Sequence, residues 1–115
     1  LKGVRFAAYH KTYAYLARRF GCAEVATVEE KPGIPPSAAH RDRLVARVRE
    51  EGIALLLINN FYDLAVPRSV AEATGAGLAV VPLHPRGADD VPDWFALIDR
   101  TIDAMVGALP APAAR

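Results

Sequence analysis

Short runs of apolar residues alternate along the chain with longer stretches in which apolar residues recur every three or four positions. The short runs, which predict buried β-strands, are residues 4–9, 24–28, 54–58 and 78–83. The stretches with helical spacing are residues 12–20, 38–51, 67–74 and 91–109. The run 54–58 is apolar at every position, which is typical of a parallel strand covered by helices on both faces. The pattern therefore predicts four strands that alternate with four helices.

Turn-forming residues mark the joins between these elements. Gly21, Gly52 and Gly75 follow the first three predicted helices, and Ser37 is expected to cap the second. Because parallel strands need crossover connections, the predicted fold is an α/β three-layer sandwich with a four-stranded parallel sheet flanked by helices. We expect one domain over residues 1–109 and a disordered Pro/Ala tail over 110–115.

Composition narrows the classes of protein to which the chain can belong. Its 115 residues include 14 Lys or Arg and 13 Asp or Glu, a balance that argues against a nucleic-acid partner. The single cysteine excludes an internal disulfide. No run approaches the ~20 apolar residues of a membrane span. The chain starts at Leu1, without Met and just ahead of a strand, so we expect a fragment of a longer protein whose leader lies outside this chain.

Polar side chains collect just past the predicted strand ends. His10 ends the first apolar run, His84 ends the last, and a polar segment at 59–63 follows the third. In an open parallel sheet, ligands bind at the carboxyl ends of the strands. Two imidazoles delivered to one edge of the sheet predict half of a metal site.

Four segments occur in an order that is typical of one protein family. They are YHKTYAYLARRFG at 9–21, PSAAH at 36–40, NFYD at 60–63 and EATGA at 72–76. Together they resemble the C-terminal lobe of the periplasmic metal-binding proteins that serve zinc and manganese ABC importers. The resemblance covers nearly the whole chain. It implies one lobe of a two-lobe receptor with a helical backbone, in which the metal lies between the lobes.

The resemblance places His10 at the position of the lobe's first metal ligand. The second ligand is usually a carboxylate in a Leu-Asp-Pro-Leu-Gly stretch after the last strand, where this chain has LHPRG at 83–87. His84 then replaces the aspartate, and Asp89 or Asp90 is the alternative carboxylate. An added histidine favours zinc over manganese, because zinc accepts imidazole nitrogen whereas manganese prefers carboxylate-rich sites.

Other residues near the strand ends have candidate supporting roles. Tyr9 is expected to shape the cleft wall, and Asn60, Tyr62 and Asp63 to hydrogen-bond His10, although capping of their own loop is an equal alternative.

Several further residues are expected to be structural or exposed. His40 lies in the first turn of a predicted helix, whose dipole disfavours an imidazolium. Glu29 and Glu30 are expected to face solvent. The cluster of Tyr9, Tyr13 and Tyr15, and the stripe of apolar residues that starts at Trp94, are expected to pack against other apolar side chains.

These features predict a metal-binding protein, with zinc as its most favoured ion, that delivers metal to the membrane permease of an ABC importer and catalyses no reaction. Its expected location is periplasmic, or extracellular and membrane-anchored. A lone lobe supplies at most half of the coordination sphere, so the missing N-terminal lobe, or a second copy in a homodimer, would complete it.

Two other classes of function remain open. The first is a small α/β enzyme that uses the same strand-end histidines as acid-base groups, although the chain lacks the common nucleotide-binding and nucleophile motifs. The second is a non-catalytic interaction module. Metal dependence distinguishes the three, because only the transport protein should hold zinc without turnover.

Overall fold

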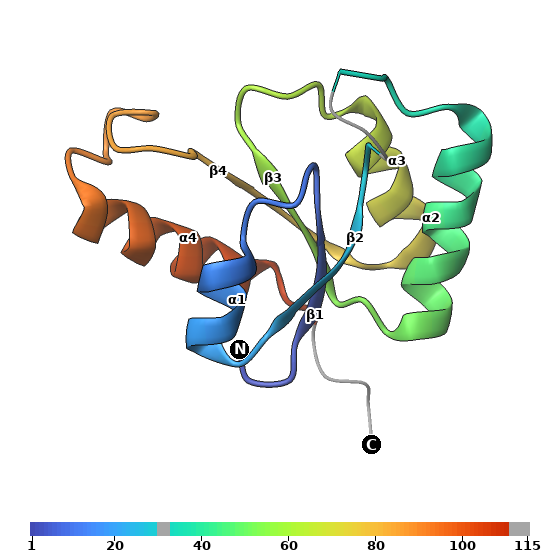
Figure 1. Cartoon of the computed structure of the whole chain (residues 1–115), viewed down its shortest axis with the longest axis horizontal. Coiled ribbons are helices and arrows are strands. Elements are labelled where there is room, and N and C mark those ends of the chain that lie inside the picture. The colour runs from blue at the N-terminus through green and yellow to red at the C-terminus, as the bar shows by residue number, and fades with distance from the viewer. Residues whose placement is uncertain (30–32, 111–115) are drawn as a thin grey trace.

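The computed structural model of the chain describes residues 1–29 and 33–110 (Figure 1). The strands are β1 (Arg5–Ala8), β2 (Ala23–Thr27), β3 (Leu55–Asn59) and β4 (Gly77–Val81). The helices are α1 (Ala14–Phe20), α2 (Ala38–Glu51), α3 (Ala65–Thr74) and α4 (Trp94–Ala108). The predicted alternation of four strands with four helices is confirmed. The expected tail lies, from residue 111 onward, outside the described residues.

All four strands are parallel and lie in the order β2-β1-β3-β4. The two central strands are paired with Ala7 opposite Leu56, and Leu57 of β3 in turn lies opposite Ala79 of β4. Since the strands share one direction, their carboxyl ends meet at a single edge of the sheet, at the top of Figure 1. The four loops that lead into the helices therefore lie along this edge.

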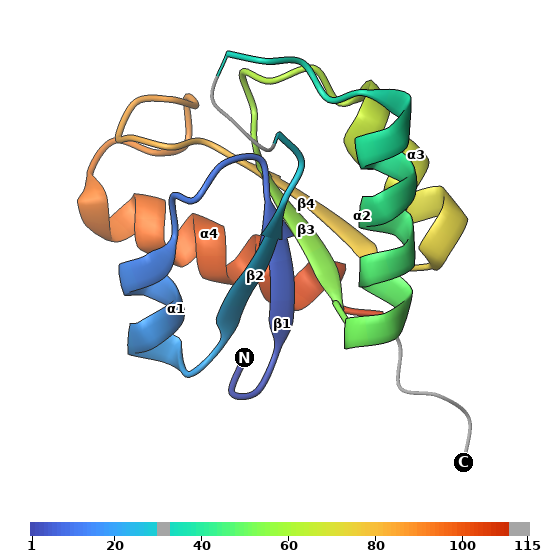
Figure 2. The same ribbon diagram turned by 45° about the vertical axis from the view of Figure 1, so that its right-hand side comes forward.

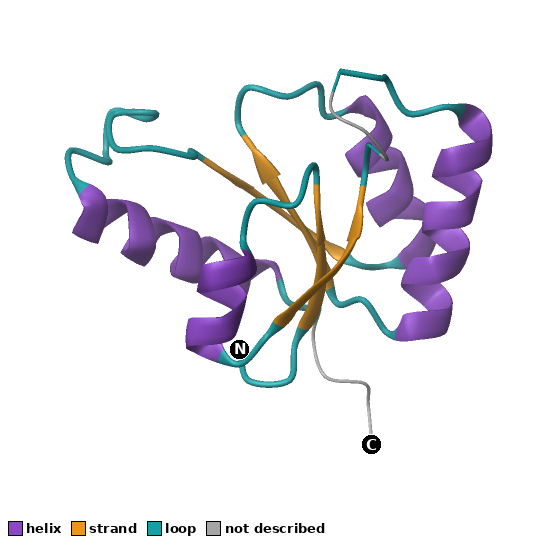
Figure 3. Cartoon of the chain, in the orientation of Figure 1, coloured by secondary structure: helices purple, strands orange, loops and turns teal. Residues whose placement is uncertain are grey.

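Helices cover both faces of the sheet, α1 and α4 on one side and α2 and α3 on the other (Figures 2 and 3). Alternate side chains of the strands fill two separate cores. Phe6 and Leu57 pack toward α1 and α4, whereas Leu56 and Ile58 pack toward α2 and α3. The three-layer α/β sandwich is thus confirmed. None of the described helices is long and apolar enough to cross a membrane.

Carboxylates accept backbone hydrogen bonds at the starts of two of the helices. The carboxylate of Glu24, on β2, accepts hydrogen bonds from the backbone N–H groups of Thr12 (3.3 Å) and Tyr13 (2.8 Å). These bonds hold residues 12 and 13 against β2, and α1 begins at Ala14, two residues later than predicted. Asp93 likewise accepts from the backbone N–H of Ala96 at 2.8 Å, and α4 begins three residues later than predicted.

We expect Gly77→Ala to destabilise the fold, because β4 begins directly against the end of α4. A Cβ atom at position 77 would lie 1.7 Å from the carbonyl oxygen of Ala108, so the helix end must move away from the sheet. The expected loss in the free energy of unfolding is about 1–3 kcal/mol, measured by urea denaturation. Gly107→Ala is the matched control, because its Cβ meets no atom within 4 Å and should leave stability unchanged or higher. Equal stability of the two variants would contradict this packing.

Candidate metal centre

His10 lies in the β1–α1 loop, between the loops that follow β2 and β3. Its Nε2 atom lies 2.5 Å from Oε1 of Glu29, and its Nδ1 atom lies 2.9 Å from the hydroxyl of Tyr62. Glu29 follows β2 and Tyr62 follows β3, the two neighbours of β1 in the sheet. The strand order therefore brings an imidazole, a carboxylate and a phenol together from three separate loops.

Two tyrosine rings hold the imidazole in place. Tyr9 and Tyr62 stack with ring centroids 3.9 Å apart and planes 10° from parallel. The ring of His10 lies edge-on to both, with centroid distances of 5.3 Å. The hydroxyl of Tyr9 donates to Oε2 of Glu29 at 3.4 Å, so each carboxylate oxygen has a polar partner.

The cluster is largely shielded from solvent. The side chain of Glu29 is 11% exposed and that of His10 is 23% exposed. Burial raises the pKa of Tyr9, and the carboxylates of Glu29 and Asp63 raise it further because negative charge disfavours the phenolate. Tyr9 therefore keeps its proton at neutral pH and remains a hydrogen-bond donor to Glu29.

The expectation that Glu29 faces solvent is wrong. Its backbone N–H donates to the carbonyl of Tyr9 at 3.1 Å, which extends the parallel pairing beyond the end of β2. Its own carbonyl accepts from the hydroxyl of Thr27 at 2.8 Å. These bonds hold Glu29 beside the β1–α1 loop, where its side chain reaches His10. Glu30 lies outside the described residues.

His84 lies in the β4–α4 loop and contacts none of these groups. Its side chain is exposed, and its Nδ1 atom lies 3.0 Å from the carbonyl oxygen of Pro85. Because β3 separates β4 from β1, the two strand ends are about 10 Å apart at the usual spacing of a sheet. In the part of the chain that the structure describes, no hydrogen bond or ring contact joins His84 to His10.

The β4–α4 loop also carries the two candidate carboxylates. Asp89 and Asp90 are both exposed, and Asp90 forms an ion pair with Arg100 of α4 at 3.7 Å. The side-chain amide of Asn60 donates to the carbonyl of Gly87 at 2.9 Å and fastens this loop to the end of β3. Asn60 therefore contacts the β4–α4 loop instead of His10.

Asp63 and His40 make structural contacts. Asp63 accepts from the backbone N–H of Ala65 at 2.9 Å, within its own loop just before α3. The Nε2 atom of His40 lies 3.1 Å from the carbonyl oxygen of Thr27, which connects α2 to the end of β2. The predicted cap of α2 is confirmed, since the hydroxyl of Ser37 accepts from the backbone N–H of His40 at 3.0 Å.

The paired donors amount to part of a coordination sphere. Within residues 1–29 and 33–110, no group of three or more His, Cys, Asp or Glu side chains is placed to hold a metal ion. His10 and Glu29 together offer one nitrogen and one oxygen donor, whereas zinc takes four ligands. A metal bound here would need further ligands from outside this cluster.

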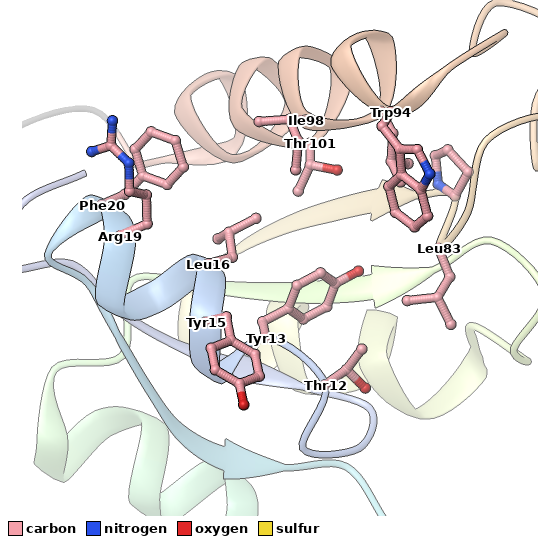
Figure 4. Close-up of a pocket in the computed structure, with 12 residues that line it drawn as sticks. Thr12, Tyr13, Tyr15, Leu16, Arg19, Phe20, Leu83, Trp94, Ile98 and Thr101 are labelled. Atoms are coloured by element: carbon pink, nitrogen blue, oxygen red, sulfur yellow. The ribbon is translucent and has the colours of Figure 1, made fainter.

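Away from His10, a hollow of 630 Å³ lies between α1 and α4 (Figure 4). Trp94 and Tyr15 line it with 64% and 86% of their surfaces exposed, so the expectation that both pack against apolar neighbours is wrong. The buried residues of α4 are Leu97, Thr101 and Met105. Trp94 precedes them, at the first turn of the helix.

Asn59, at the end of β3, makes a buried hydrogen bond that links the sheet to α1. Its side-chain amide donates to the hydroxyl of Tyr13 at 2.6 Å, and Asn59 is 3% exposed. Burial raises the pKa of Tyr13 above its ordinary value of 10.0, although the hydrogen bond from Asn59 partly opposes the shift. The folded chain therefore holds this phenolic proton more tightly than the unfolded chain does.

We expect the stability contributed by Tyr13 to be complete below about pH 10 and to be lost as pH rises through its higher folded-state pKa. Tyr13→Phe should flatten this alkaline loss, which urea unfolding at a series of pH values measures. At neutral pH, Tyr13→Phe should lower the free energy of unfolding by about 1–3 kcal/mol, because the buried side-chain amide of Asn59 loses its hydrogen-bond partner. Tyr15→Phe, at an exposed position, is the control. An alkaline loss of stability that is identical in Tyr13→Phe and the unmodified chain would refute this role.

Comparisons with known proteins agree with this architecture. The family model ZnuA, described as the periplasmic component A of the zinc-uptake complex, matches residues 1–108. Comparison with curated proteins gives no match.

Solved structures of metal-binding proteins share the fold. The SBP (solute-binding protein) FpvC from Pseudomonas aeruginosa, in complex with Mn²⁺, matches with a TM-score of 0.74 and 22% identity over 92% of this chain and 40% of its own. A zinc-bound ZnuA deletion mutant matches with a TM-score of 0.68 and 21% identity, over 97% of this chain and 40% of its own. An Mn-bound mutant of a periplasmic metal-binding protein from Candidatus Liberibacter asiaticus matches with a TM-score of 0.70 and 17% identity. The match covers 93% of this chain and 41% of that protein. The chain thus spans about 40% of the length of these structures.

Proposed function

The chain belongs to the ZnuA family of periplasmic zinc-uptake components, and on that premise we propose that it is the C-terminal lobe of a solute-binding protein that delivers zinc to an ABC importer. The observation that carries the proposal is the fixed imidazole of His10 at the carboxyl edge of the sheet. The family and its structural neighbours indicate metal binding in general, since the matched proteins are described with Mn²⁺ or zinc. The choice of zinc is part of the proposal.

His10 is the proposed primary ligand, through its Nε2 atom. Tyr62 engages Nδ1, which leaves Nε2 directed toward Glu29 and the edge of the sheet. Metal-ligating histidines commonly bond their second nitrogen to a neighbouring polar group, which orients the ring. The contact with Tyr62 therefore supports a ligating His10.

His84 is the proposed second ligand, with Asp89 and Asp90 as alternatives in the same loop. The exposed ring of His84 is accessible to an ion held between this lobe and another. Two imidazoles favour zinc, and manganese is the second candidate.

The remaining ligands are proposed to come from an N-terminal lobe, or from a second copy of the chain if the lobe acts alone. In this proposal, residues 1–109 form the C-terminal lobe, and metal captured between the lobes passes to the membrane permease of an ABC importer. The proposed location is periplasmic, or extracellular and membrane-anchored. No reaction is assigned to the protein.

Loss of a group that only hydrogen-bonds a metal ligand lowers affinity by about 10–100-fold. His10→Ala removes the proposed ligand itself, so we expect it to lower zinc affinity by more than about 100-fold. His84→Ala should weaken binding less, and His40→Ala should leave it unchanged, since His40 contacts the end of β2. Calorimetric zinc titration of the three variants beside the unmodified chain measures these effects. Equal losses in His10→Ala and His40→Ala would exclude His10 as a specific ligand.

A further inference from the structure

We propose that Glu29 is the carboxylate ligand of this half-site and that it binds the metal beside His10. This inference rests on the proposed function, because it takes the metal as the cargo of the protein. The sequence pattern assigns Glu29 no role, and the resemblance to the metal-binding family directs attention to the loop after β4 instead. The observation behind the inference is the 2.5 Å contact between Oε1 of Glu29 and Nε2 of His10.

The two atoms are close to the separation that a shared metal ion requires. Zinc binds imidazole nitrogen and carboxylate oxygen at about 2.0–2.2 Å, which places the two donors roughly 3.3 Å apart at a tetrahedral angle. In the structure they are 2.5 Å apart, within hydrogen-bonding distance. An ion bound between the two atoms would take the place of the hydrogen-bonding proton, which is released to solvent, once the donors are about 0.8 Å further apart. His10 needs no rearrangement, because Tyr62 already fixes its ring.

The carboxylate of Glu29 is hydrogen-bonded, but neither of its side-chain partners carries a permanent positive charge. Its side chain is 11% exposed, and burial of a carboxylate is costly unless a cation pairs with it. Among the residues that the structure describes, no lysine or arginine forms an ion pair with Glu29. Its partners are the imidazole of His10 and the hydroxyl of Tyr9. A divalent cation bound beside His10 would supply positive charge to this carboxylate.

The rival carboxylates are less suited to the same ion. Asp89 and Asp90 are exposed, and Asp90 already pairs with Arg100. Their loop follows β4, which β3 separates from the strand that carries His10. Glu29 follows β2, which is hydrogen-bonded directly to β1, and its backbone is bonded to Tyr9 at 3.1 Å.

A carboxylate in the half-site also influences metal preference. Oxygen ligands suit manganese, whereas zinc is held well by nitrogen ligands alone. If Glu29 binds the ion, removal of its charge should weaken Mn²⁺ binding more than Zn²⁺ binding. Glu29 would then oppose the preference for zinc that the two histidines create.

The variant Glu29→Gln keeps the volume of the side chain and removes its charge. Calorimetric titration of this variant and of the unmodified whole chain, with Zn²⁺ and with Mn²⁺, tests whether Glu29 is a ligand. We expect a loss of at least about 10-fold for Zn²⁺ and a larger loss for Mn²⁺. Asp90→Asn tests the rival carboxylate, and Glu50→Gln removes the same charge at an exposed position of α2. Glu50→Gln should bind as the unmodified chain does, Asp90→Asn should lose less affinity than Glu29→Gln, and thermal unfolding of every variant confirms that it is folded.

The visible spectrum of bound Co²⁺ separates a ligand from a residue that only positions His10. Loss of a ligand should change the spectrum in Glu29→Gln, whereas loss of a positioning contact would lower affinity and leave the spectrum unchanged. An unchanged spectrum, unchanged affinity or tighter binding in Glu29→Gln would each overturn the inference and leave the proposed function intact. Failure of the unmodified chain to bind either metal would overturn the proposed function, and the inference with it.

Discussion

All four strands run in one direction, and the position of each polar group near the candidate metal centre depends on this constraint. A parallel sheet needs crossover helices, and their apolar stripes cover both of its faces, so polar chemistry is left to the loops at the strand ends. The central place of β1 then decides which loops meet. His10 lies between the loops after β2 and β3, whereas the loop after β4 is one strand further away.

The elements could be predicted from the sequence because their signals are local. Apolar runs mark the strands, and Gly52 and Gly75, with φ of 65° and 77°, end two helices in a conformation that other residues rarely adopt. The starts of α1 and α4 were predicted less well, and at each of them a carboxylate, of Glu24 or of Asp93, accepts backbone hydrogen bonds. The bond from Glu24 joins segments that are distant in sequence, and a local pattern contains no sign of it.

The candidate site could be predicted only in part, for a related reason. The position of His10 at a strand end was evident in the sequence, but its contact with Glu29 requires β1 and β2 to be adjacent. Nothing in the local sequence at Glu29 distinguishes a buried carboxylate from a solvated one. His84 shows the converse: it matches His10 in the sequence pattern, yet the strand order places β3 between them.

The hollow between α1 and α4 contains the chain's one tryptophan, and this gives the molecule an intrinsic fluorescent probe. With 64% of its surface exposed, Trp94 emits from a polar environment, and any apolar surface that covers this face would shift its emission to the blue. The aromatic residues that contact His10 are tyrosines, so the indole signal arises away from the candidate metal centre. Contact of this face with another lobe or protein can therefore be followed optically, without a label.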